Sequence, residues 1–116
     1  MITVEEVAAL VEGRIVGGAQ FKDQQVECIF ASDLMSDVLT LRNDENLMLM
    51  TGLCNLQSIR TCEMSDINMV LFVRGKKVTP EMIELAEENE IVLVETDFSM
   101  YKSSGILFGA GIPPIY

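Results

Sequence analysis

The sequence predicts an α/β fold: a mainly parallel sheet of about four to five strands, built from βα units with flanking helices. Four short apolar runs recur at nearly equal intervals, since their starts lie 21, 22 and 22 residues apart. Runs of this length that are apolar on both faces are typical of strands buried on both sides of a parallel sheet. The gaps between them are too long for hairpins and long enough for one helix each. The four runs are Val26–Ala31, Leu47–Met50, Met69–Val73 and Ile91–Val94.

A helix and a short strand are predicted before the first of these runs. Thr3 at the N-cap position and Glu6 three residues later have the spacing of a capping box, which predicts a helix over Thr3–Leu10. Gly13 ends this helix. The segment Arg14–Val16, closed by two glycines, is predicted as the additional short strand.

Helix signals fill the gaps between the apolar runs. The clearest start is Thr79 followed by Pro80, because threonine caps a helix and proline fits the first helical position. Asn89 is the expected C-cap of that helix. Further helices are predicted over Ser36–Leu41, which is short, over Asn55–Met64, and over Phe98–Phe108, entered through Asp97 or Ser99.

The length of 116 residues fits one compact domain, predicted over residues 1–108. The segment 109–116 contains two glycines and two prolines, so it cannot be helical and is predicted to be extended or mobile. The first residues lack the basic region of a signal peptide, and no apolar run approaches the ~18 residues of a membrane helix. These features predict a cytoplasmic protein.

Charge and composition exclude several functions. Eighteen acidic and eight basic residues give a net charge of −10, which disfavours binding to nucleic acids and to anionic membranes. The absence of histidine excludes Ser–His and Cys–His nucleophile activation. The three cysteines, Cys28, Cys54 and Cys62, form no C-x-x-C pair, so neither a disulfide framework nor a structural zinc site is indicated. We therefore expect no cofactor and no metal.

Candidate binding residues follow the predicted strands, because ligands of open parallel sheets bind beyond the carboxyl ends of the strands. Serine, threonine and aspartate at these places also cap the next helix, so capping is the alternative role for each of them. The segment Arg74–Lys77 gathers three of the eight basic residues, where a phosphate or carboxylate would meet positive charge. The alternative for this segment is a solvated turn. The candidate ligand-binding residues are Ser32, Asp33, Ser36, Thr51, Gly52, Asn55, Arg74, Gly75 and Lys76.

Two patterns admit a catalytic interpretation. Asp33 and Asp37 lie four residues apart and could form a paired acid site or a weak Mg²⁺ site, although capping explains them as well. Cys54 precedes a predicted helix N-terminus, where the pKa of a thiol can be lowered. Because neither pattern has a histidine, a P-loop or a metal cluster beside it, we predict that the protein is not an enzyme.

Three segments carry a family resemblance: Ala31–Leu39 (ASDLMSDVL), Thr51–Thr61 (TGLCNLQSIRT) and Val73–Lys76 (VRGK). They resemble the DRTGG-domain family, and the resemblance extends over residues 4–108 in the same order of strands and helices. The Asp-Arg and Thr-Gly-Gly elements that give the family its name are absent, and the corresponding places read GLC at 52–54 and VRG at 73–75.

The resemblance implies both a fold and a function. DRTGG domains are similar to the N-terminal domain of HPr kinase/phosphorylase, itself similar to the N-terminal domain of MurF-type ligases, so an α/β fold without the kinase domain and its activity is implied. In this family such domains stand beside other modules in phosphotransacetylases and in regulated inorganic pyrophosphatases. In the pyrophosphatases they help to form a dimeric regulatory region that binds adenine nucleotides.

Two functions are therefore predicted. The first is a non-catalytic regulatory module that forms a homodimer and binds an adenine nucleotide or another small phosphorylated ligand at the strand carboxyl ends. The alternative is a protein–protein interaction or dimerisation module without a small-molecule ligand. That module would use an apolar face or the segment Ile112–Tyr116 to bind a second copy or another protein.

Overall fold

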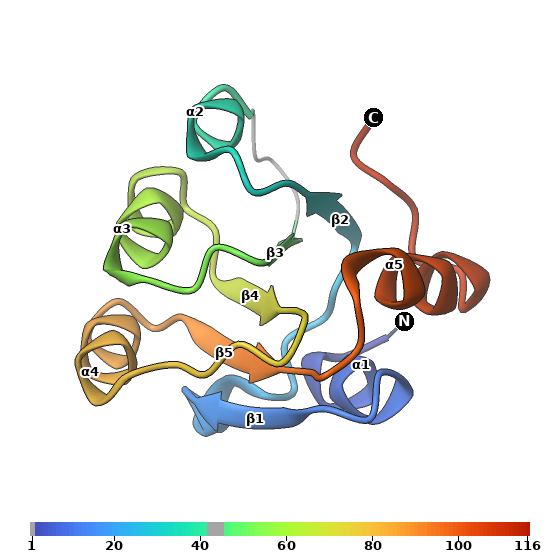
Figure 1. Cartoon of the computed structure of the whole chain (residues 1–116), viewed down its shortest axis with the longest axis horizontal. Helices are drawn as coiled ribbons and strands as arrows, with labels where there is room; N and C mark the ends of the chain where they lie inside the picture. Colours follow the sequence, from blue (N-terminus) through green and yellow to red (C-terminus); the bar gives the residue numbers. More distant parts are fainter. Residues whose placement is uncertain (1, 42–45) are drawn as a thin grey trace.

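The computed structural model describes residues 2–41 and 46–116. Within these residues five strands form one sheet in the order β1-β5-β4-β3-β2 (Figure 1). Strands β2 to β5 pair in parallel, and β1 pairs antiparallel with β5 at one edge. The predicted mainly parallel sheet is confirmed. The strands are β1 (Arg14–Gly17), β2 (Cys28–Ala31), β3 (Leu47–Thr51), β4 (Met69–Phe72) and β5 (Val92–Glu95).

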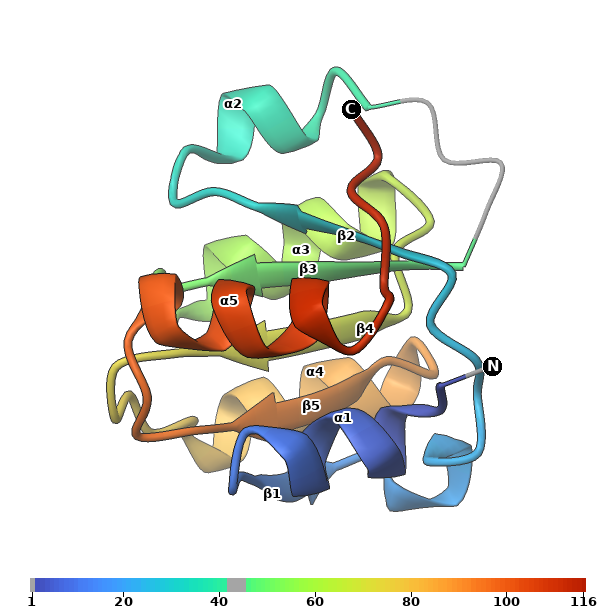
Figure 2. The same ribbon diagram turned by 90° about the vertical axis from the view of Figure 1, so that its right-hand side faces the viewer.

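Helices cover both faces of the sheet: α2, α3 and α4 lie on one face, and α1 and α5 lie on the other (Figure 1 and Figure 2). Because β2 to β5 are neighbours in sequence order, right-handed crossovers place the three connecting helices on the same face. None of the described helices is long and apolar enough to cross a membrane. The helices are α1 (Val4–Leu10), α2 (Met35–Val38), α3 (Leu56–Met64), α4 (Pro80–Glu88) and α5 (Met100–Gly109), with a 3₁₀ turn, η1 (Ala19–Phe21).

Side-chain caps begin four of the helices at the predicted places. Thr3 and Glu6 form a complete capping box at the start of α1. The side chains of Asn55, Thr79 and Ser99 each accept a hydrogen bond from the backbone N–H three residues further on, at 3.0 to 3.2 Å. Of the two starts considered for α5, the serine is therefore the cap. Each cap satisfies a backbone donor that the first helical turn leaves without a partner.

Helix α2 differs from its prediction. The sequence predicts a helix over Ser36–Leu41, whereas the structure has one over Met35–Val38 that begins without a side-chain cap. After this helix, the backbone N–H groups of Thr40 and Leu41 bond to carbonyls three residues back, so the chain continues as a tight turn.

Two apolar layers enclose the sheet, because alternate residues of each strand point to opposite faces. In β4, Val70 and Phe72 belong to the layer beneath α2, α3 and α4, which includes Ile59 of α3. Leu71, between them, belongs to the opposite layer together with Leu107 of α5. Strands β3, β4 and β5 are buried along their whole length, as expected for runs that are apolar on both faces.

The C-terminal segment lies along the outer edge of β2 (Figure 2). The N–H of Ile29 donates to the carbonyl of Pro113 at 3.1 Å, and the N–H of Ile115 donates to the carbonyl of Ile29 at 3.3 Å. The rings of Phe30 and Tyr116 meet edge to face with centroids 6.2 Å apart. The segment therefore supplies partners for backbone groups of an edge strand, a position that its glycines and prolines do not indicate.

Candidate functional site

The carboxyl ends of β2, β3 and β4 bring together four of the predicted residues, Asp33, Thr51, Gly52 and Arg74, which we call the rim cluster. Asp33 Oδ1 accepts a hydrogen bond from the backbone N–H of Gly52 at 2.6 Å and another from the hydroxyl of Thr51 at 3.1 Å. The Thr51 hydroxyl oxygen in turn accepts a bond from the N–H of Leu53 at 3.0 Å. One carboxylate therefore joins the loops that follow β2 and β3.

The guanidinium of Arg74 lies over Gly52. A Cβ atom at Gly52 would stand 3.0 Å from Arg74 Nη2 and 3.3 Å from Asp33 Oδ1, so the missing side chain makes room for the guanidinium. The Arg74 side chain is exposed. Within the described residues, no carboxylate oxygen lies within 4.0 Å of its nitrogens. The rim cluster thus presents a cation whose hydrogen-bond donors are free of ion pairs.

The loop that carries Arg74 is fixed to the end of β5. Arg74 and Gly75 both adopt the left-handed backbone conformation, with φ of 66° and 72°. In this conformation the N–H of Arg74 donates to the carbonyl of Phe98 at 2.8 Å, and the N–H of Gly75 donates to the carbonyl of Thr96 at 3.0 Å. A non-glycine residue pays a steric penalty there, and these two bonds offset it.

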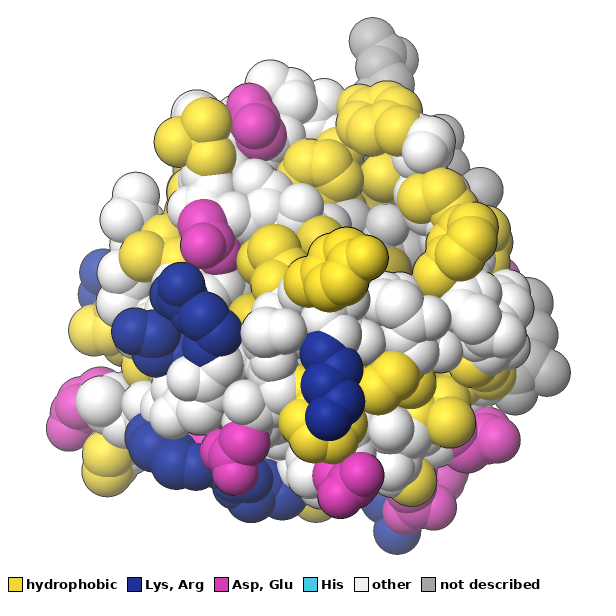
Figure 3. All heavy atoms as spheres, turned by 45° about the vertical axis from the view of Figure 1, so that its right-hand side comes forward, with side chains coloured by type: hydrophobic (Ala, Val, Ile, Leu, Met, Phe, Trp, Pro, Cys, Tyr) yellow, Lys and Arg dark blue, Asp and Glu magenta, His cyan; other side chains and the backbone are white. Residues whose placement is uncertain are grey.

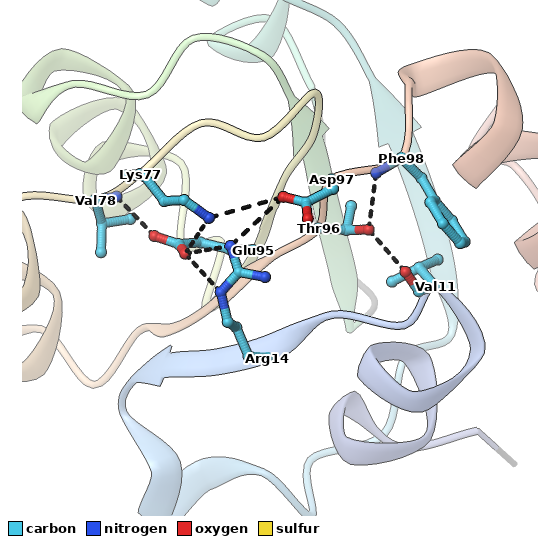
Figure 4. A network of polar contacts seen from close by, with 8 residues as sticks. All are labelled: Val11, Arg14, Lys77, Val78, Glu95, Thr96, Asp97 and Phe98. Carbon is cyan, nitrogen blue, oxygen red and sulfur yellow. Dashed lines mark hydrogen bonds and ion pairs between the residues drawn. The ribbon is translucent and has the colours of Figure 1, made fainter.

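The buried carboxylate of Glu95 contacts the loop after β4, which carries Arg74 (Figure 4). The side chain of Glu95 is 5% exposed. Its Oε2 accepts the N–H of Val78 at 2.7 Å, and its Oε1 accepts Nε of Arg14 at 3.1 Å. Lys77 Nζ lies 3.8 Å from the same Oε1. The carboxylate therefore links β1, the end of β5 and the loop after β4.

Glu95 and Arg14 are functional candidates that the sequence analysis missed. The available signal is a single acid at the end of an otherwise apolar run, IVLVE, because an acid buried at that place needs a cationic partner. Thr96, like Glu95, joins distant segments. Its hydroxyl donates a hydrogen bond to the carbonyl of Val11 at 2.7 Å and accepts one from the N–H of Phe98 at 3.1 Å.

The remaining predicted residues do not join the hydrogen bonds of the rim cluster. The hydroxyl oxygen of Ser32 accepts the N–H of Leu34 at 3.0 Å within its own turn. Ser36 is exposed on α2. Asn55 caps α3, so the capping alternative describes its observed contacts. Lys76 is exposed in the loop after β4.

The environment of Cys54 opposes thiol chemistry. A helix N-terminus predicts a lowered pKa, but desolvation, together with the charge of Glu95, raises the pKa of Cys54 to about 11, and Lys76 offsets this only in part. Burial raises the pKa of Cys62 to about 12. The raised pKa argues against the catalytic interpretation of Cys54, since desolvation outweighs the field of the helix.

The aspartate pair gains no metal-binding partners. The Asp33 carboxylate bonds to the loop after β3, and Asp37 lies in α2. Across residues 2–41 and 46–116, no group of three or more His, Cys, Asp or Glu side chains is arranged to hold a metal ion.

These features define a small α/β domain with a polar rim at the carboxyl ends of its parallel strands. No family model matches the chain, and no curated protein sequence matches it. A solved structure matches the fold of this chain. It contains the CBS and DRTGG domains of the regulatory region of Clostridium perfringens pyrophosphatase, complexed with the activator diadenosine tetraphosphate. The TM-score is 0.70 at 13% sequence identity, and the match covers 90% of this chain and 45% of that chain.

This likeness shows that the two chains share a fold. It agrees with the expected α/β architecture, and the matched protein is a regulatory region, not a catalytic domain. The chain spans less than half of the solved chain that it matches. The specific relation to HPr kinase/phosphorylase, the homodimer and the cytoplasmic location stay predictions.

Proposed function

We propose that this protein is a non-catalytic regulatory module that binds a small phosphorylated ligand at the rim cluster. The observation that carries the proposal is the Arg74 guanidinium, which lies over a glycine, on a loop fixed by backbone bonds, without an ion-pair partner among the described residues. A guanidinium free of ion pairs can donate two parallel hydrogen bonds to phosphate oxygens.

Charge favours a small ligand over a polymer. The protein carries a net charge of −10, so a polyanion that extends over its surface is repelled. A single phosphate group at the rim would contact Arg74, with Lys76 as a second cation in the same exposed loop. The acidic residues elsewhere on the surface then act against larger anions.

Within this class we propose an adenine nucleotide as the ligand. Two observations support the choice: the resemblance of the rim segments to the DRTGG family, and the shared fold with a regulatory region solved with an adenine dinucleotide. Since the chain spans 45% of that solved chain, we further propose that it acts together with other domains or chains.

The test is calorimetric titration of the folded protein with AMP, ADP, ATP and pyrophosphate. Binding to the folded state alone must also raise Tm. We expect Arg74→Gln to weaken binding about tenfold or more, because a charge-assisted contact to phosphate is lost.

The matched control is Arg60→Gln, which removes another exposed arginine, on α3. It should leave the affinity unchanged. Equal weakening by both variants would mean that net charge alone attracts the nucleotide, and no binding by any of the four compounds would refute the ligand.

A dimerisation module without a small-molecule ligand is the second candidate. The observation that favours it is an uneven distribution of charge: all 18 acidic residues lie within residues 1–97, and residues 98–116 contain none. In that segment Tyr101, Phe108 and Tyr116 are exposed by 91%, 68% and 83%. The exposed side chains of this segment therefore bring no acidic group that would repel a second copy.

A further inference from the structure

A pocket of about 250 Å³ lies between α5, β2 and the C-terminal segment. Figure 3 shows hydrophobic side chains gathered on the face that carries these elements, with a hollow among them. The pocket is lined by Phe30 and Met50 from the sheet, Ser104 and Phe108 from α5, and Ile112 and Tyr116 from the C-terminal segment, among others. Carbon atoms therefore form nearly all of its wall.

The size of the pocket limits what it can hold. A cavity of about 150 Å³ lined by Leu, Ile and Phe accommodates benzene in another protein, so 250 Å³ has room for a fused double ring. Pockets that enclose whole drug-sized ligands start at roughly 300 Å³. The pocket consequently fits one planar ring system and leaves any attached polar group outside.

The side chains at the pocket suit a ring. Phe30 and Tyr116 stand edge to face, and the exposed Phe108 adds a third ring. Aromatic rings attract one another beyond the burial of their area. Two lining residues, Ser104 and Tyr116, carry hydroxyls, and that of Ser104 lies 3.5 Å from the thioether sulfur of Met50. Sulfur is a weak acceptor, so this hydroxyl can donate to a ring nitrogen instead.

The pocket adjoins the rim. Ala31 and Met50, which line it, are register partners: Ala31 is the last residue of β2, and Met50 is the last but one of β3. The next residue of β3 is Thr51, and Asp33 follows two residues after Ala31. One strand residue spans about 3.3 Å, so backbone of the pocket wall continues directly into the rim cluster.

We propose that this pocket binds an uncharged planar aromatic ring the size of a purine. Residues 98–116 contain no acid, so acidic side chains repel an anion less at the pocket than elsewhere on the protein. The carbon-lined wall nevertheless offers no partner for an ionised group, so we expect the bound ring to be uncharged. The proposal goes beyond phosphate binding at the rim, since the ring contributes affinity without any phosphate.

The test uses adenosine, which carries a purine ring and no phosphate, with ribose as the control without a ring. Amide shifts of the ¹⁵N-labelled protein are followed by NMR during each titration. We expect saturable shifts at Ile29, Ser104 and Ile115 with adenosine and none with ribose.

Two variants then probe the pocket, and a third is the matched control. Phe108→Ala and Tyr116→Ala should each weaken adenosine binding roughly 3- to 10-fold, the effect of one aromatic contact. Tyr101→Ala removes an equally exposed ring of α5 that does not line the pocket, so it should leave the affinity unchanged. Both pocket residues are exposed, and a cooperative thermal transition confirms that the variants fold. Tm should be unchanged in Phe108→Ala and slightly lower in Tyr116→Ala, which also loses the ring contact with Phe30.

Three results would overturn the proposal. The first is the absence of saturable shifts at the pocket, even if nucleotides bind at the rim; the proposed function then stands without the ring site. The second is equal weakening by Tyr101→Ala. The third is a wild-type dimer in analytical ultracentrifugation that Phe108→Ala converts to monomer, because a second copy would then occupy the pocket and the dimerisation candidate would gain support.

Discussion

Arg74 combines a left-handed backbone conformation with an exposed guanidinium that has no ion pair among the described residues. The left-handed conformation costs a non-glycine residue roughly 1–2 kcal/mol, and glycine would adopt it without that cost. The arginine side chain contributes no ion pair within the described residues that would offset the cost. The two backbone hydrogen bonds to the segment after β5 offset the cost and fix the direction in which the side chain leaves the loop, which supports a binding role for Arg74.

Cys54 shows how a single environment decides reactivity. It is partly exposed, whereas Cys28 and Cys62 are buried. We expect iodoacetamide to alkylate Cys54 slowly at pH 8, with a rate that rises about tenfold per pH unit and levels off only near pH 11, because the thiolate is the nucleophile. A thiol with the ordinary pKa of 9.0 would level off near pH 9.

The control for this measurement is Cys54→Ser, which should leave the native protein unreactive. A rate that is already constant at pH 8 would contradict the raised pKa. The raised pKa also makes stability depend on pH, because the folded state holds the Cys54 proton more tightly than the unfolded state. The free energy of unfolding therefore falls as pH rises above 9.

Helix α5 contains a glycine, Gly105, at a position where no neighbouring atom within the monomer requires the lack of a side chain. A Cβ atom at Gly105 would meet nothing within 4 Å, and the residue lies in the middle of the helix. Alanine is a better helix former than glycine by about 1 kcal/mol. We therefore expect Gly105→Ala to raise the free energy of unfolding by about 1 kcal/mol in urea denaturation.

Gly18→Ala is the contrasting variant. Gly18 has φ of 67°, and a Cβ atom there would lie 2.6 Å from the carbonyl oxygen of Ile91, so this substitution should destabilise the protein. If Gly105→Ala also lowered stability, the exposed face of α5 would have to be in contact with something outside the monomer.

At the scale of the whole molecule, the C-terminal segment closes one edge of the sheet. Removal of residues 113–116 deletes both hydrogen bonds to Ile29 and the contact between Phe30 and Tyr116. We expect the truncated protein to lose about 1–3 kcal/mol of stability, which lowers Tm by roughly 5–15 °C. Its uncovered edge should also increase aggregation with concentration.

The control for the truncation is Tyr116→Ala, which removes the ring contact and keeps the backbone bonds. It should lower Tm by a smaller amount. If the truncation left Tm and aggregation unchanged, the segment would contribute nothing to closing the edge.

Much of the fold could be predicted because the signals are local. The spacing of the apolar runs predicts parallel strands with helical connections, and a polar N-cap residue marks the start of every predicted helix except α2, as at Thr79 and Asn55. The proximity of three candidate residues could be predicted for the same reason: parallel strands end at one edge, so Asp33, Gly52 and Arg74 meet there.

Contacts between residues that are distant in sequence could not be predicted from local patterns. The pairing of Arg14 with Glu95 joins residues 81 positions apart, and the C-terminal segment lies against a strand more than 80 residues earlier. Neither partner's sequence indicates the other, because both contacts depend on which strand occupies which edge.

Periodicity and capping act over a few residues, so the amino-acid pattern alone predicts the class of fold, the direction of four strands, most helix caps and the edge at which polar loops gather. The raised pKa of Cys54, the support of the Arg74 loop by Glu95 and the pocket beside α5 could not be predicted in this way. These depend on burial and on distances between segments, which exist only once the chain has packed.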